Sequence, residues 1–257
     1  MRIIISPAKK MSVNTDLFPC SGTPQFMNET EELLGILKSM SYDELKEIWN
    51  CSDALAELNY ERVQNMDLYN RLTPAIFSYE GIQYQYMAPR VFTEDALKYV
   101  EENLRILSGF YGVVKPFDGV TPYRLEMQAR LGRKNADSLY SFWGKKIAEN
   151  IFEETDTVIN LASKEYSKCV EPYVTDHKKM ITCIFGEMIV NKKGQTKLKE
   201  KATLCKMARG EMVRFMAETK VKNAEEIKGF DRLGFKFSED LSDQNTFIFV
   251  KQEETKC

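Results

Sequence analysis

The sequence contains a single histidine, His177, and none of its six cysteines forms a CxxC pair. One histidine cannot build a three-histidine zinc site or a two-histidine iron site, and the cysteine spacing matches neither zinc ribbons nor thioredoxins. No run of about 18 apolar residues occurs, which argues against a membrane span. The apolar stretch before Pro7 is too short for a secretory signal. We therefore expect a cytoplasmic protein with reduced thiols, no metal or other cofactor and no membrane partner.

Several enzyme signatures are also missing. The motifs GxGxxG, GxxxxGK[ST], GxSxG and HExxH do not occur. Their absence excludes P-loop phosphate binding, serine-hydrolase catalysis of the GxSxG type and zincin chemistry.

The composition of the chain is that of a globular protein, with 43% hydrophobic and 29% charged residues among 257. It contains no repeat of 20–50 residues and no linker rich in Pro, Gly or Ser. This composition and length predict one domain over residues 1–257, with a polar tail at 252–257 that we expect to fray.

Strand and helix patterns alternate along the chain, which predicts an α+β fold. Buried strands are expected at Arg2–Ile5, Ala75–Tyr79 and Thr157–Ala162, and an antiparallel pair at Phe235–Phe237 and Thr246–Val250. Helical spacing covers residues 26–39, 93–107, 136–152 and 201–219. Two further short helices predict a helical hairpin near residues 41–66, in which Ser41 and Glu44 form a capping box.

Charge is distributed unevenly along the chain. Residues 1–120 hold 11 basic and 17 acidic side chains, whereas residues 178–214 alone hold ten Lys or Arg and three Glu. This basic segment is typical either of a solvated face or of a surface that binds a polyanion.

Polar residues follow the first predicted strand, where Ser6 and Lys9 would lie at an edge of the sheet. Ligands bind at this kind of edge in open α/β sheets, and a lysine there can hold an anion. A solvated turn is the alternative interpretation.

The central segment holds a second group of polar residues. Gly109 and Gly112 flank two aromatics, which predicts a backbone path that side chains would block. If Tyr123–Met127 is a strand, Arg124 and Glu126 share one face, where a buried pair would bind an anion or transfer a proton. An exposed ion pair of little energetic value is the alternative.

Two later segments complete the set. Asn160 and Ser163 end a predicted strand, and Ser163 is either a plain helix cap or part of an anion site. Gly210 follows Arg209 inside a predicted helix, which indicates that a backbone or a ligand approaches closely.

Taken in order, ISPAK, LSGFYGVVKPFDGVTPYRLEMQARL, NLASKEY and ARGEMVRF resemble the YaaA peroxide-stress family over essentially the whole chain. The resemblance implies a bacterial cytosolic protein that defends against hydrogen peroxide by keeping free intracellular iron low. It also implies a curved mixed sheet wrapped by helices, and DNA binding through a helix-hairpin-helix element and a basic cleft.

The resemblance places one group of residues around a common cleft: Ser6, Lys9, Tyr123, Arg124, Glu126, Asn160, Ser163 and Arg209. The predicted hairpin departs from the usual DNA-binding pattern, since Asn50-Cys51-Ser52-Asp53 contains no glycine and acidic residues surround it. Contact with DNA phosphates is therefore expected from basic residues after 121.

Three hypotheses follow. In the first, the protein binds double-stranded DNA non-specifically through a basic cleft, with Ser6, Arg124, Asn160, Ser163 and Arg209 as anion contacts. In the second, the same cleft acts on a nucleotide, a nucleobase or another small anionic ligand, with Lys9, Tyr123 and Glu126 as catalytic groups. The third, a direct iron binder, ranks last because the chain has one histidine and scattered cysteines, which leaves an all-carboxylate site as its alternative.

Overall fold

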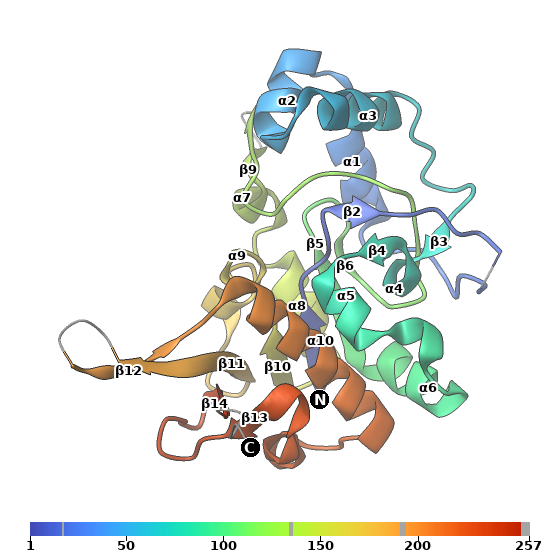
Figure 1. Ribbon diagram of the computed structural model, residues 1–257. Helices are drawn as coiled ribbons and strands as arrows, with labels where there is room; N and C mark the ends of the chain where they lie inside the picture. Colours follow the sequence, from blue (N-terminus) through green and yellow to red (C-terminus); the bar gives the residue numbers. More distant parts are fainter. Residues whose placement is uncertain (17, 134–135, 191–193, 253–257) are drawn as a thin grey trace.

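The structure is a computed structural model that describes residues 1–16, 18–133, 136–190 and 194–252 (Figure 1). Among these residues, eight strands form one mixed sheet in the order β13-β14-β11-β10-β1-β5-β6, with β12 paired to β11. These strands are β1 (Arg2–Ile5), β5 (Leu104–Ser108), β6 (Gly112–Val114), β10 (Thr157–Leu161), β11 (Lys179–Val190), β12 (Thr196–Lys199), β13 (Phe235–Phe237) and β14 (Thr246–Lys251). The α+β prediction is confirmed.

The middle of the sheet is parallel. Strand β1 pairs in parallel with β5 on one side and with β10 on the other, so that Ile3 lies opposite both Leu104 and Ile159. Strands β11 and β14 continue the parallel order, and β6, β12 and β13 are antiparallel additions. The predicted strand Arg2–Ile5 and the antiparallel pair of β13 with β14 are confirmed.

Three small two-stranded pairs lie outside the main sheet. They are β2 (Lys10–Met11) with β4 (Tyr79–Glu80), β3 (Thr73–Pro74) with β7 (Gly119–Val120), and β8 (Arg130–Arg133) with β9 (Ala136–Ser138).

Helices surround the sheet (Figure 1). The α-helices are α1 (Met27–Lys38), α2 (Tyr42–Trp49), α3 (Asp53–Gln64), α4 (Ala75–Ser78), α5 (Ile82–Met87), α6 (Glu94–Asn103), α7 (Leu139–Trp143), α8 (Lys146–Glu153), α9 (Lys164–Ser167) and α10 (Ala202–Thr219). The 3₁₀ turns are η1 (Pro89–Val91), η2 (Glu171–Tyr173), η3 (Ala224–Gly229) and η4 (Arg232–Gly234). Helix α10 packs against α5, α6 and β11.

The helices α2 and α3 occupy the predicted hairpin region and contact each other. The capping box is confirmed, because Glu44 N–H donates to Ser41 Oγ while Ser41 N–H donates to the Glu44 carboxylate. Asn50 adopts a left-handed conformation, with φ of 41°, where the chain turns between the two helices. A role for this pair in DNA binding stays a prediction.

Three predicted elements differ from the structure. Residues 75–78 form helix α4 instead of a strand, and all four are buried. The helix that begins after Thr93 ends at Asn103, and Leu104–Ser108 form strand β5 instead of a last helical turn. The predicted helix over 136–152 is interrupted at Gly144, which has a φ of 48° and separates α7 from α8.

Other predictions fall outside the described residues or concern absences. The tail predicted to fray lies mostly beyond residue 252, outside the described ranges. Within those ranges, no helix is both long and apolar enough to cross a lipid bilayer. The five cysteines that the structure describes are free thiols.

Candidate functional site

The site lies where two neighbouring parallel strands end. Strands β1 and β10 are neighbours in the sheet. The next strand of the sheet after β1 is β5, which lies on the side of β1 away from β10. The next strand after β10 is β11, which lies on the side of β10 away from β1. The carboxyl ends of β1 and β10 therefore flank a point where the strand order reverses, and open α/β sheets bind ligands at such points. Ser6 and Ser163 follow these two ends, and Ser163 N–H donates a 2.9 Å hydrogen bond to Ser6 Oγ.

A cavity of about 420 Å³ opens at this point, and we call it the inner cavity. Its wall comes from the segments after β1 and β10, from α5 and α10, and from residues 123–126. The predicted site residues that line it are Ser6, Lys9, Tyr123, Arg124, Glu126, Ser163 and Arg209. The volume is within the range usual for small-molecule sites.

Residues 123–126 form no strand, so the strand expected over Tyr123–Met127 is wrong. Arg124 and Glu126 nevertheless lie together, as their spacing predicted: they form an ion pair at 3.5 Å, and both line the inner cavity, as do Tyr123 and Leu125. Gly109 permits this path, because a Cβ there would lie 2.5 Å from the backbone oxygen of Leu125.

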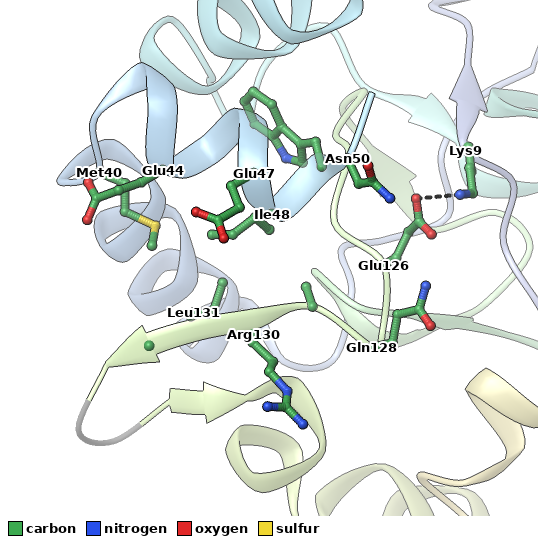
Figure 2. Close-up of a pocket in the computed structure, with 13 residues that line it drawn as sticks. Lys9, Met40, Glu44, Glu47, Ile48, Asn50, Glu126, Gln128, Arg130 and Leu131 are labelled. Carbon is green, nitrogen blue, oxygen red and sulfur yellow. Dashed lines mark ion pairs between the residues drawn. The ribbon is translucent and has the colours of Figure 1, made fainter. Parts of the chain in front are cut away.

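Glu126 is the charged centre of the site. Its carboxylate forms an ion pair with Lys9 Nζ at 2.8 Å as well as with Arg124. The Lys9 side chain is 63% exposed, whereas those of Arg124 and Glu126 are 11% and 17% exposed. Figure 2 shows the Lys9–Glu126 pair. Lys9 is therefore a solvated cation held at the rim, while Arg124 lies deeper.

Two guanidinium groups keep unused donors. Arg124 donates weakly from Nη2 to the backbone oxygen of Trp49 at 3.4 Å, but its buried Nε has no partner. Arg209, on α10, makes no hydrogen bond or ion pair with any described residue, and its Nε is buried as well. Burial lowers the pKa of Arg209, yet an arginine stays charged at neutral pH. An uncompensated buried cation is costly, and an anionic ligand would offset that cost.

Tyr123 is almost fully buried, and its hydroxyl is held in a fixed network. It lies 2.6 Å from Ser108 Oγ and 2.8 Å from the hydroxyl of Tyr79. Burial raises the pKa of Tyr123 to about 12, so the phenol stays protonated at neutral pH. It can orient or donate a hydrogen bond but cannot act as a base there.

The Asn160 amide and the Ser163 backbone N–H already make hydrogen bonds within the protein. Asn160 lies outside the cavity lining and is buried; its Oδ1 accepts from Ala162 N–H, and its Nδ2 donates to Thr182 Oγ1. The Ser163 N–H is taken by Ser6, and helix α9 has only four residues. These groups hold the strand ends together, and a role for Asn160 and Ser163 as anion contacts stays a prediction.

Sequence reasoning missed several residues of the inner cavity, among them Gln83 and Glu165. Gln83 lies in the short helix α5, outside any motif, so no sequence signal identified it. Glu165 belongs to the NLASKEY segment, so that motif could have identified it. Burial raises the pKa of Glu165, and the negative charge of Glu126 acts in the same direction.

A second cavity of about 530 Å³ adjoins the first, and we call it the outer cavity. It lies between α2 and the segment that leads into β8, and Lys9 and Glu126 line both cavities (Figure 2). The buried Trp49 lines it and leaves Nε1 without a partner. Glu44 and Glu47 make the α2 side of this cavity acidic.

Comparison with known proteins identifies the family. A family model described as "Peroxide stress protein YaaA" matches residues 1–241. The chain belongs to the YaaA peroxide stress protein family. It is 56% identical to a UPF0246 protein of Lachnoclostridium phytofermentans over 98% of this chain and 97% of the relative. UPF0246 proteins of Pediococcus pentosaceus and Lactiplantibacillus plantarum are 53% and 49% identical, over 98% of this chain and at least 99% of each relative.

Proposed function

We propose that this YaaA-family protein binds a small anionic ligand, with a phosphate or carboxylate group, in the inner cavity. One observation carries the proposal: the cavity is lined by two largely buried arginines, Arg124 and Arg209, whose Nε atoms have no partner. A guanidinium group matches the geometry of phosphate and carboxylate groups. Their place at the ends of β1 and β10 is where the fold class binds ligands.

On this proposal the protein acts in the cytoplasm during peroxide stress, where it limits iron-driven oxidative damage. The family description supports the link to peroxide. Lys9, Tyr123 and Glu126 stay proposed catalytic groups around the anion, with Tyr123 restricted to a donor role. The described residues contain no group of three His, Cys, Asp or Glu side chains placed to hold a metal ion.

Isothermal titration calorimetry with inorganic phosphate and pyrophosphate tests the proposal. We expect the double variant Arg124→Ala/Arg209→Ala to lose at least tenfold in affinity, since charged hydrogen bonds contribute about 1.5–3 kcal/mol each. Arg214→Ala is the matched control, because Arg214 lies on the same helix but pairs with Glu218 outside the cavity. Wild-type protein that binds neither anion, or a double variant that binds as well as wild type, would overturn the proposal.

Non-specific binding of double-stranded DNA is the second candidate, and a separate observation favours it. Lys197, Lys199 and Lys206 are exposed and make no ion pair with described residues, and Lys206 also lines the inner cavity. The first two lie on β12, which forms a ribbon with β11 that extends from the body of the molecule (Figure 1). Unpaired exposed lysines on such a ribbon can contact the phosphates of a duplex that the inner cavity is too small to admit.

Fluorescence anisotropy with a labelled duplex across a salt series tests this candidate. The expected result is binding that weakens steeply with salt. Binding lost in Lys197→Ala/Lys199→Ala but kept in Arg124→Ala/Arg209→Ala would assign DNA to the ribbon. The reverse pattern would assign DNA to the cavity, and the absence of binding at low salt would exclude this candidate.

A further inference from the structure

Unpartnered buried donors concentrate at one place in the molecule. Among the described residues, five buried side-chain nitrogens have no hydrogen-bond partner: Trp49 Nε1, Gln83 Nε2, Arg105 Nε, Arg124 Nε and Arg209 Nε. Three of these side chains line the inner cavity, namely those of Gln83, Arg124 and Arg209. A buried donor without a partner costs about 1–3 kcal/mol, so a cluster of them indicates a ligand that supplies acceptors.

Gln83 is fixed in position by the packing of two helices. Its residue is 7% exposed, and its backbone oxygen lies so close to α10 that a Cβ at Gly210 would be 2.1 Å away. Arg209 is the residue before Gly210. The Gln83 amide and the Arg209 guanidinium are therefore held relative to each other by the contact between α5 and α10.

The rest of the wall does not suit a bare anion. Three tyrosines, Tyr84, Tyr123 and Tyr166, line the inner cavity together with Ile82 and Leu125. Aromatic and aliphatic side chains favour a flat, partly apolar group, and tyrosine rings stack on nucleobases. A phosphate bound at the arginines would leave this part of the wall uncovered.

We propose that the inner cavity binds a nucleotide, with its phosphate at Arg124 and Arg209 and its base along the tyrosine-lined wall. The Gln83 amide meets the edge of the base. A glutamine amide can donate from its nitrogen to adenine N7 while its oxygen accepts from adenine N6, so an adenine nucleotide is the expected ligand. This inference rests on the proposed anion site and adds its substrate class and a specificity-determining residue.

Calorimetric titration of the full-length protein with AMP and with ribose 5-phosphate separates the two proposals. Both ligands carry the phosphate, and only AMP carries the base. We expect AMP to bind at least tenfold more tightly. Ribose 5-phosphate binding as tightly as AMP would overturn the nucleotide proposal and leave the anion site intact. If neither ligand binds, the anion site fails and the nucleotide proposal fails with it.

Two variants on α5 complete the test. Gln83→Met keeps the length of the side chain but removes the amide, and we expect about a tenfold loss of AMP affinity with ribose 5-phosphate unchanged. Gln85→Met is the control, because Gln85 lies on the same helix, is exposed and does not line the inner cavity. Equal losses for both ligands in Gln83→Met would show that the residue acts through helix packing, which overturns its role in specificity. If Gln83→Met does not fold, the comparison of AMP with ribose 5-phosphate on wild type still decides the ligand class.

Discussion

The hydroxyl of Ser6 accepts a hydrogen bond from the backbone N–H of Ser163 at 2.9 Å, although the two residues are 157 positions apart. This contact joins the end of β1 to the end of β10 at the mouth of the inner cavity. The two serine hydroxyls also lie 3.2 Å apart. The first prediction concerns the unequal consequences of removing each hydroxyl.

Ser6→Ala leaves the Ser163 N–H without its partner, so we expect a loss of about 1–3 kcal/mol in the free energy of unfolding. Ser163→Ala keeps that N–H bonded to Ser6 and removes only the longer contact, so its loss should stay below about 1 kcal/mol. Urea denaturation of both variants measures the difference. Equal losses would show that the backbone hydrogen bond does not stabilise the strand ends.

The contact between α5 and α10 yields the second prediction. Gly210→Ala places a methyl group 2.1 Å from the Gln83 backbone oxygen, and we expect a loss of about 1–3 kcal/mol in stability together with weaker anion binding. Gly35→Ala is the control, since a Cβ there meets nothing within 4 Å in helix α1. That variant should be about 0.5–1 kcal/mol more stable than wild type. The denaturant midpoints of the two variants measure these changes in stability. A Gly210→Ala variant as stable as wild type would contradict the close packing.

The sequence predicted which segments pack closely better than it predicted where helices and strands begin and end. Leu104 and Leu107 continue the helical spacing of α6, and local pattern alone cannot show that pairing with β1 converts them into strand β5. Gly210 was different, because a glycine inside a helix is locally unfavourable and so pointed to the close approach of the α5 backbone.

The same contrast applies to the site residues. Arg124 and Glu126 could be placed on one face from their alternation, and they do share the inner cavity. Asn160 was expected in the cleft, but its distance from the cavity depends on the register of β10, which the sequence does not reveal. Gln83 had no local signal at all, because its importance comes only from packing against α10.

The third prediction uses Asp118, a buried carboxylate remote from the site. Burial raises the pKa of Asp118 to about 6, although Lys115 N–H donates to it at 2.7 Å. A raised folded-state pKa means that the folded protein holds the proton more tightly than the unfolded chain. This group therefore stabilises the fold at low pH, and that contribution falls between about pH 4 and pH 6.

Asp118→Asn should remove this dependence. At pH 7.5 we expect the variant to be more stable than wild type by about 3 kcal/mol at most, and at pH 4 the two should be similar. Urea midpoints at both values give the difference. A variant that is less stable at pH 7.5 would show that the ionised carboxylate is favourable in the fold.

The fourth prediction concerns the charge of Glu126. Its carboxylate forms ion pairs with Lys9 and Arg124, so it competes with an anionic ligand for these two cations. Glu126→Gln should fold normally and bind inorganic phosphate about fivefold more tightly, which corresponds to about 1 kcal/mol. Glu218→Gln serves as control, because Glu218 pairs with Arg214 and Arg232 outside the cavity. Weaker phosphate binding in Glu126→Gln would mean that the carboxylate chiefly positions the two cations.

The central claim is that Arg124 and Arg209 together hold an anion at the carboxyl ends of β1 and β10. A crystal structure of the wild-type protein with AMP, grown without sulfate or phosphate, tests it most directly. The account predicts phosphate density within hydrogen-bond distance of both guanidinium groups. AMP bound at another surface, or an empty inner cavity at AMP concentrations that saturate the protein in solution, would contradict it.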